Sequence, residues 1–164
     1  MTREFDARAD RYGHFYDEFE VGDIYRHWPG KTITESEDHL YCMLTMASSP
    51  LHIDSHFAKT EMPQGENIVV GTYIYALLTG MSVVDISGKA IASLGVKELS
   101  HLLPVFHGDT IYASTEILNK RLSKSKINQG IVTVKTSGTN QNSQVICTFE
   151  RSFLVPLQGQ HNEF

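Results

Sequence analysis

The segment of residues 48–56 holds the side chains of this chain that are best suited to acid–base chemistry. It reads Ser-Ser-Pro-Leu-His-Ile-Asp-Ser-His. His52 follows a proline and is expected in a turn between two helices, and loops often carry functional residues. Because imidazole titrates near neutral pH, His52 is a candidate general acid or base. The alternative is a structural histidine, which is the commoner role of a lone histidine in a loop.

The same segment allows two further interpretations. On a strand, the i, i+2, i+4 spacing of His52, Asp54 and His56 would place them on one face, where they could bind zinc. Pro50 and the helical pattern after His56 instead favour a turn that enters a helix, where these side chains diverge, so we predict no metal site. In the third interpretation Asp54 caps that helix and His56 is a solvated residue of its first turn.

Gly71 is a candidate binding residue at the expected start of the most apolar helix, over residues 71–84. Without a side chain, glycine lets a ligand approach the free backbone N–H groups at a helix N-terminus. These donors and the helix dipole can stabilise an oxyanion. The alternative is that the glycine only permits close packing.

Other elements must position these residues. A strand is expected over residues 24–33, interrupted by Pro29 and Gly30. Thr34 and Glu37 form a capping box that predicts a helix start, and the run Ser48-Ser49-Pro50 predicts its end. A second short helix is expected from Asp54 to about residue 62.

The second half of the chain predicts strands over residues 90–99, 110–122, 130–138 and 144–155. Their short separators favour antiparallel hairpins. One long apolar helix followed by about four long strands indicates an α+β fold in which a curled antiparallel sheet wraps around a central helix, the hot-dog arrangement. Other α+β folds remain compatible with the composition.

Composition restricts the function classes. With 164 residues the chain fits one domain, and 14 basic against 19 acidic residues give a net charge of −5 without a basic stripe, which argues against nucleic-acid binding. Two cysteines do not make a disulfide scaffold, and no apolar leader is found at the N-terminus, so a cytoplasmic protein is expected. The uncharged stretch 67–84 is too polar for a membrane span.

Several short segments in a fixed order carry a resemblance to a known family. They are Asp17-Glu18-Phe19-Glu20-Val21-Gly22-Asp23, Gly30-Lys31-Thr32-Ile33-Thr34-Glu35, Pro50-Leu51-His52-Ile53-Asp54, Val69-Val70-Gly71-Thr72, Pro104-Val105-Phe106-His107-Gly108-Asp109-Thr110, residues 138–140 and residues 151–156. The chain resembles the MaoC-like dehydratases, or (R)-specific enoyl-CoA hydratases, and is most similar to the mesaconyl-CoA hydratase branch.

The resemblance implies a hot-dog domain over residues 15–156, between a polar N-terminal segment (1–14) and a polar C-terminal tail (157–164). It also implies a homodimer or a dimer of dimers. The substrate would be an enoyl thioester of coenzyme A, with no cofactor besides the coenzyme A of the substrate and with no nucleic-acid or membrane partner.

The resemblance also implies roles for single residues. His52 matches the family's catalytic histidine, and Gly71 matches the glycine whose N–H binds the thioester carbonyl. Thr79 falls near a family serine that supports the catalytic loop. The family carries an aspartate five residues before the histidine, and Ala47 stands there in this chain. Ser48, Ser49 and Asp54 are the candidate substitutes for that acid near the substrate.

We therefore expect hydration of an α,β-unsaturated acyl-CoA, with His52 as the acid–base residue and the Gly71 N–H on the thioester carbonyl. Because Ala47 cannot exchange a proton, a catalytically silent thioester-binding or regulatory protein is the first alternative. An acyl-CoA thioesterase is the second, since hot-dog proteins also hydrolyse thioesters.

Overall fold

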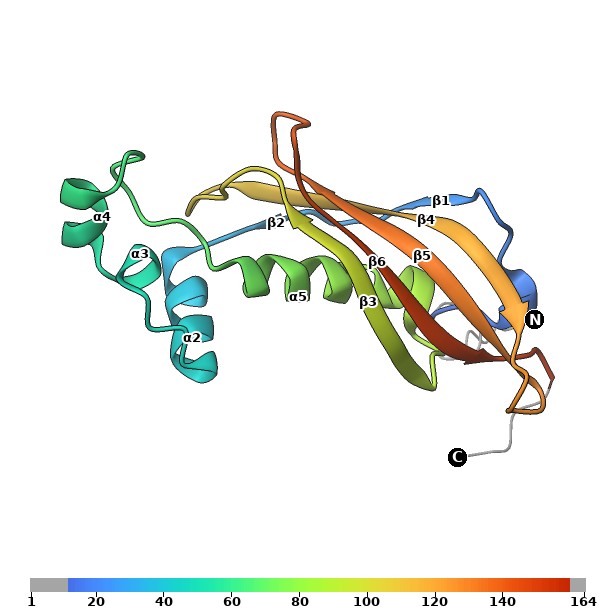
Figure 1. The fold of residues 1–164 in the computed structure, drawn as a ribbon. Coiled ribbons are helices and arrows are strands. Elements are labelled where there is room, and N and C mark those ends of the chain that lie inside the picture. Colours follow the sequence, from blue (N-terminus) through green and yellow to red (C-terminus); the bar gives the residue numbers. More distant parts are fainter. Residues whose placement is uncertain (1–11, 160–164) are drawn as a thin grey trace, which may run out of the picture.

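The computed structural model describes residues 12–159 (Figure 1). Most of the expected polar N-terminal segment, residues 1–11, and most of the expected C-terminal tail, residues 160–164, lie outside the described residues.

One antiparallel sheet dominates the fold. It runs in the order β1-β4-β5-β6-β3, and β2 pairs with β4 beside β1. The strands are β1 (Ile24–Arg26), β2 (Lys31–Thr32), β3 (Ala92–His101), β4 (Thr110–Leu122), β5 (Gln129–Thr139) and β6 (Val145–Pro156). The long strands β4, β5 and β6 follow each other as hairpins, as predicted, and β3 forms the edge beside β6.

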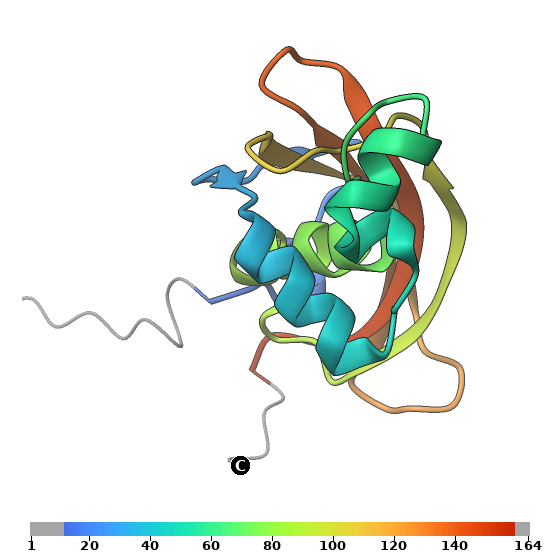
Figure 2. The same ribbon diagram turned by 90° about the vertical axis from the view of Figure 1, so that its left-hand side faces the viewer.

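The helix α5 (Gly71–Met81) lies along the inner face of this sheet, which curves past it (Figures 1 and 2). Its buried residues Ile74 and Leu78 pack into a core cluster with residues of the strands. Along β5, buried Val132 and Val134 alternate with partly exposed neighbours, which is the period-2 pattern of a strand with one face on the core. The hot-dog arrangement expected from the sequence is therefore confirmed.

Three short helices stack at the end of the molecule where α5 begins (Figure 2). They are α2 (Glu35–Thr45), α3 (Pro50–Ile53) and α4 (Ser55–Glu61). Thr34 and Glu37 form the predicted capping box of α2. Asp54 caps α4 as predicted, because its carboxylate accepts a hydrogen bond from the Phe57 N–H at 2.9 Å.

Some boundaries differ from the prediction. The helix α2 ends at Thr45, before the run at Pro50, because Met46 adopts a left-handed conformation that terminates it. The central helix ends at Met81 and continues as a π turn (Val83–Ser87). His52 lies in the one-turn helix α3, which starts at Pro50, rather than in a plain turn.

None of the helices within residues 12–159 has the length and apolar character needed to span a bilayer. The uncharged stretch 67–84 instead contains α5, which lies along the sheet.

Candidate active site

A cavity of about 380 Å³ opens beside the start of α5. His52 from α3 and Gly71 from α5 both line it, so the two residues singled out in the sequence face one space. Most of the remaining wall is apolar, contributed by Ile68, Ile74 and the stretch that follows β3. Such a wall suits a small, mostly apolar group and leaves few polar partners to orient it.

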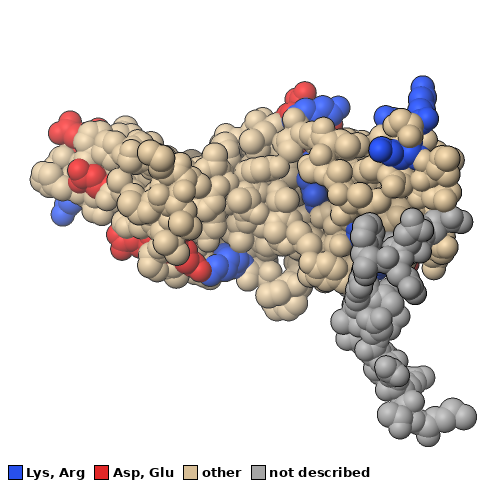
Figure 3. All heavy atoms as spheres, turned by 90° about the horizontal axis from the view of Figure 1, so that it is seen from below, with Lys and Arg blue, Asp and Glu red and all other residues tan. Residues whose placement is uncertain are grey.

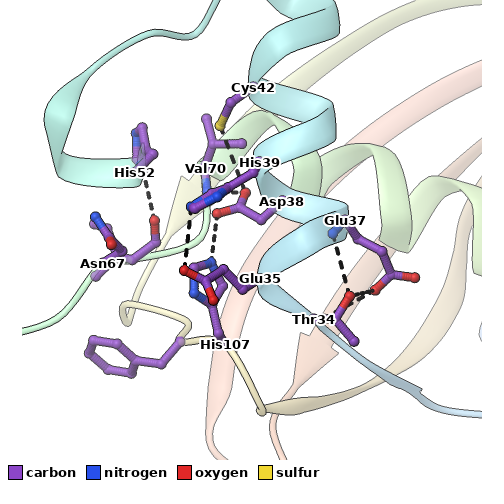
Figure 4. Close-up of polar contacts among 12 residues, drawn as sticks. Thr34, Glu35, Glu37, Asp38, His39, Cys42, His52, Asn67, Val70 and His107 are labelled. Carbon is purple, nitrogen blue, oxygen red and sulfur yellow. Dashed lines mark hydrogen bonds and ion pairs between the residues drawn. The ribbon is translucent and has the colours of Figure 1, made fainter. Parts of the chain in front are cut away.

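The His52 ring is held in one orientation. Its Nδ1 lies 2.8 Å from the carbonyl oxygen of Ile68 (Figure 4). Because a carbonyl oxygen only accepts, Nδ1 carries the hydrogen and donates it. In the neutral ring Nε2 then keeps its lone pair, and the ring lines the cavity with that nitrogen available to accept a proton. This is the tautomer that a general base requires.

Asn67 fixes the helix that carries His52. Its side-chain amide donates to the carbonyls of Leu51 at 2.9 Å and Pro50 at 3.3 Å. Its carbonyl accepts from the Ser55 hydroxyl at 2.8 Å. The residue is buried, so these bonds satisfy its amide in a setting where an unpaired group would be costly. One amide therefore ties α3 and α4 to the strand-like segment before α5.

Asp38 fixes the start of α5 from the other side (Figure 4). This carboxylate is fully buried on α2. It accepts from the Val70 N–H at 3.1 Å and from Nε2 of His107 at 2.9 Å. The first N–H groups of a helix have no acceptor within the helix. Asp38 accepts from the N–H of Val70, the residue just before α5, and the N–H of Gly71 is left for a ligand. Burial, reinforced by the Asp38 charge, raises the pKa of the neighbouring Cys42 thiol.

The other residues predicted near the substrate have different surroundings. Ala47 lies in the turn after α2, where its N–H bonds to the Cys42 carbonyl, and Ser48 and Ser49 are exposed. Asp54 is occupied as a helix cap. None of these four residues lines the 380 Å³ cavity.

The Thr79 hydroxyl bonds within its own helix. It lies two turns into α5 and donates to the Tyr75 carbonyl at 2.9 Å. The side chain that bonds to the carbonyls of α3 is Asn67. Within residues 12–159 no three His, Cys, Asp or Glu side chains are grouped as metal ligands.

Sequence reasoning missed four residues of this region: Asn67, Asp38, His107 and His101. Asn67 precedes the Ile68-Val69-Val70-Gly71 run, and a buried amide inside an apolar stretch is a usable signal. Asp38 falls on the buried side of α2 beside Cys42, which the helical period could have shown. The two histidines come from the region after the long helix, and only tertiary packing brings them here.

The arrangement combines a histidine with an open Nε2 and a helix N-terminus with an open N–H on one apolar cavity. A carbonyl oxygen held at that N–H would receive the stabilisation that a developing negative charge needs. A proton could be taken or given by the histidine nearby. The chemistry that fits is proton transfer next to a polarised carbonyl.

Comparison with known proteins supports this interpretation. The family model described as mesaconyl-CoA hydratase matches residues 3–162. A mesaconyl-CoA hydratase of Cereibacter sphaeroides is 31% identical over 144 residues, which cover 87% of this chain and 41% of that protein. The (R)-specific enoyl-CoA hydratase of Aeromonas caviae is 31% identical over 129 residues, which cover 77% of this chain and 89% of that enzyme.

A solved structure, a MaoC domain protein dehydratase of Chloroflexus aurantiacus, superimposes with a TM-score of 0.84 at 26% identity, covering 92% of this chain and 42% of that one. This chain thus spans less than half the length of the first curated relatives that it matches. The match of the family model over nearly the whole chain and the shared fold show that the protein belongs to the mesaconyl-CoA hydratase family, within the MaoC-like dehydratases.

Proposed function

We propose that this protein adds water to the double bond of an α,β-unsaturated acyl-CoA thioester, and removes it in the reverse direction. The observation that carries the proposal is that His52, with Nε2 open, and Gly71, at the start of α5, line one apolar cavity. Relatives named mesaconyl-CoA hydratase and (R)-specific enoyl-CoA hydratase support the same reaction. A short branched acyl group such as mesaconyl is the substrate class we favour, and coenzyme A enters only as part of the substrate.

In this mechanism the thioester oxygen accepts a hydrogen bond from the Gly71 N–H. The carbonyl is thereby polarised, and the β-carbon becomes electrophilic. His52 Nε2 takes a proton from the water that attacks the β-carbon. The bond from His52 Nδ1 to the Ile68 carbonyl stabilises the imidazolium that forms, because that carbonyl accepts from either protonation state.

We further propose that two copies associate along β3. This edge strand is exposed over its whole length and presents apolar side chains, including Leu94, Val96 and Leu99. An open apolar edge normally pairs or is covered. The face of α5 turned away from the sheet also shows few charged side chains (Figure 3). Two copies of this chain together would match the length of the longer relatives, which are single chains. Analytical sedimentation at several protein concentrations tests whether the dimer forms.

The setting we favour is the reducing cytoplasm. Cys42 and Cys147 are both free and buried, which supports that assignment. Burial raises the pKa of the Cys147 thiol to about 11, so it remains a neutral thiol at physiological pH.

The reaction is tested with purified protein and crotonyl-, mesaconyl- and itaconyl-type CoA thioesters, following loss of the conjugated double bond by absorbance. The wild type is expected to hydrate at least one of them, and His52→Ala to lose about 10²–10⁴-fold in kcat, the usual contribution of a general acid or base. Equal rates for the two proteins would overturn the role of His52.

A catalytically silent thioester-binding protein is the second candidate, because Ala47 replaces the family's acid. Calorimetric binding of a CoA thioester without turnover would favour it. Release of free coenzyme A thiol in place of hydration would identify a thioesterase. A thiol-detecting reagent added to the same assay measures that release.

A further inference from the structure

A second histidine lies in the proposed active-site cavity. His101 is the last residue of β3 and lines the 380 Å³ space together with His52. The two imidazoles are the titratable side chains of its lining, and the other side chains there are apolar. Two groups that can exchange protons therefore line one apolar cavity. Of these two, the sequence predicts a catalytic role only for His52.

The His101 ring rests directly on Gly71. A Cβ built on Gly71 would lie 2.9 Å from Nε2 of His101, which is closer than real Cβ contacts, and 3.1 Å from Cε1. The ring edge that bears Nε2 thus occupies the space over the Gly71 Cα. A side chain at position 71 would have to push this imidazole aside.

The His101 ring is available to a ligand. It makes no hydrogen bond or ion pair with any other group in residues 12–159, and it is exposed. His107, a few residues further along, is instead committed to the buried carboxylate of Asp38. A free ring beside the Gly71 N–H is placed where the carbonyl end of a bound thioester would lie.

The two rings reach the cavity from the two ends of one short segment. His52 bonds to the carbonyl of Ile68, and the His101 ring lies against Gly71. An extended chain of three residues spans about 10–11 Å at most, which limits the distance between these two contact points. Both rings line the 380 Å³ cavity, and His101 lies on its Gly71 side.

Hydration needs a proton donor for the α-carbon besides the base that activates water. Ala47 cannot provide it, because a methyl group carries no exchangeable proton and this residue does not line the cavity. We propose that His101 is the second catalytic residue of this site and protonates the α-carbon of the enoyl thioester, an inference that rests on the proposed hydratase function.

The step balances as follows. Water oxygen bonds to the β-carbon while His52 Nε2 takes one of its protons. The π electrons of the double bond move toward the thioester, whose oxygen is held by the Gly71 N–H, and the α-carbon takes the proton from Nε2 of protonated His101. His52 is left protonated and His101 neutral, and exchange with solvent restores both.

The test compares His101→Gln and His101→Phe with the wild type, and uses His56→Gln as the matched control on an exposed histidine of α4. Glutamine keeps a hydrogen-bond donor but cannot transfer a proton, and phenylalanine keeps the ring volume. Both His101 variants are expected to lose about 10²–10⁴-fold in kcat. KM within a few-fold of wild type and an unchanged melting temperature would accompany that loss, and His56→Gln should match the wild type.

A second readout follows the bond itself. In the dehydration direction, a 3-hydroxyacyl-CoA deuterated at the α-carbon should react more slowly than the protonated one, and this isotope effect should grow in His101→Gln because removal of that hydrogen becomes limiting. A variant impaired only in folding would show no such growth.

The outcomes separate the two proposals. If the wild type hydrates a thioester and His101→Gln keeps its kcat within threefold, the role of His101 is overturned while the hydratase function stands. If the glutamine variant keeps its activity and the phenylalanine variant loses it, His101 acts only as a hydrogen-bond donor. That result would also overturn the proposed proton transfer from His101 to the α-carbon. A wild type without turnover on any thioester would overturn both proposals.

Discussion

Histidines from other elements lie near the two ends of α5, and their situations are opposite. At its start, His52 uses Nδ1 in one hydrogen bond and keeps Nε2 open to a cavity. At its far end, His27 is fully committed: Nδ1 lies 2.7 Å from the Asp85 carboxylate, and Nε2 lies 2.8 Å from the Thr115 hydroxyl. The His27 side chain is 1% exposed. Both rings are fixed, but only one can meet a substrate.

This difference shows which feature marks a reactive histidine. The chain from Asp85 through His27 to Thr115 has the residue types of a carboxylate, a base and a hydroxyl nucleophile. Thr115 also bonds to Thr136 at 3.0 Å. Thr115 and Thr136 are nevertheless fully buried, so no substrate reaches them. The His27 network connects β4 and β5 with the turn after α5, and a stabilising role follows.

Removing His27 should therefore produce a large loss of stability without a loss of chemistry. His27→Ala removes one partner of the buried Thr115 hydroxyl and the partner of the Asp85 carboxylate, and it creates a cavity, so we expect a loss of about 2–4 kcal/mol in the free energy of unfolding. Urea denaturation measures this loss, and kcat per folded molecule should stay within a few-fold of wild type. If His27→Ala were as stable as the wild type but inactive, His27 would have a role in the reaction and not in stability.

Asn67 should show the complementary behaviour at the cavity end. Asn67→Leu loses both donations to the carbonyls of α3, so His52 is no longer held in place. We expect kcat to fall about 10–100-fold, since a small displacement of a catalytic group costs this much. Asn67→Asp keeps the size but cannot donate to these carbonyls, so it should lose at least as much kcat as the leucine variant. Steady-state kinetics on monodisperse protein provide the measurement. An unchanged kcat in the leucine variant would show that α3 is positioned by other contacts.

Ala47→Asp tests whether the family's acid position still governs this site. Ala47 lies outside the cavity lining, and His101 occupies the thioester end. We therefore expect kcat to change by less than about tenfold, well under the contribution of an added acid–base group. A gain of 100-fold or more in the same absorbance assay would show that the parent protein lacks a partner for His52.

The smallest effect concerns the helix that carries Asp38. A hydrogen bond from Lys31 at 2.5 Å, assisted by those from Thr34, lowers the pKa of Glu37 to about 2. A lowered pKa in the folded state means stability that is present above the unfolded value of about 4.3 and is lost as pH falls toward 2. Both side chains of the ion pair are about 40% exposed, so solvent screening keeps its contribution to stability small.

Glu37→Gln should therefore lower the melting temperature at pH 7 by a few degrees at most. The gap to wild type should narrow between pH 4.5 and 2, because the wild-type carboxylate loses its charge there. Glu35→Gln, on the exposed side of the same helix turn, is the control. A gap that persists at pH 2 would contradict this account of the α2 cap.

The sequence predicted the parts of the fold that local rules govern. The capping residues Thr34 and Asp54 predicted the starts of their helices. The alternation of apolar and polar residues around Val132 and Val134 predicted a strand. His52 and Gly71 were found because a proline turn and a helix start are local patterns, and the structure brings both to one cavity.

The partners of those residues could not be found in the same way. Asp38 meets Val70 across 32 residues, and His101 meets Gly71 across α5, the π turn and the whole of β3. Such contacts depend on how the sheet closes over the helix, and no spacing rule encodes that. The bonds of Asn67 to α3 were missed for a related reason, because they form only once the chain is folded.

The short segment 68–71 has a further consequence for how the site tolerates thermal motion. His52 is hydrogen-bonded to the Ile68 carbonyl, so a displacement of this segment moves its imidazole as well. His101 belongs to β3 and meets Gly71 only through ring contact, so its imidazole follows the edge of the sheet. The spacing of the two imidazoles therefore depends on how residues 68–71 pack against the end of β3.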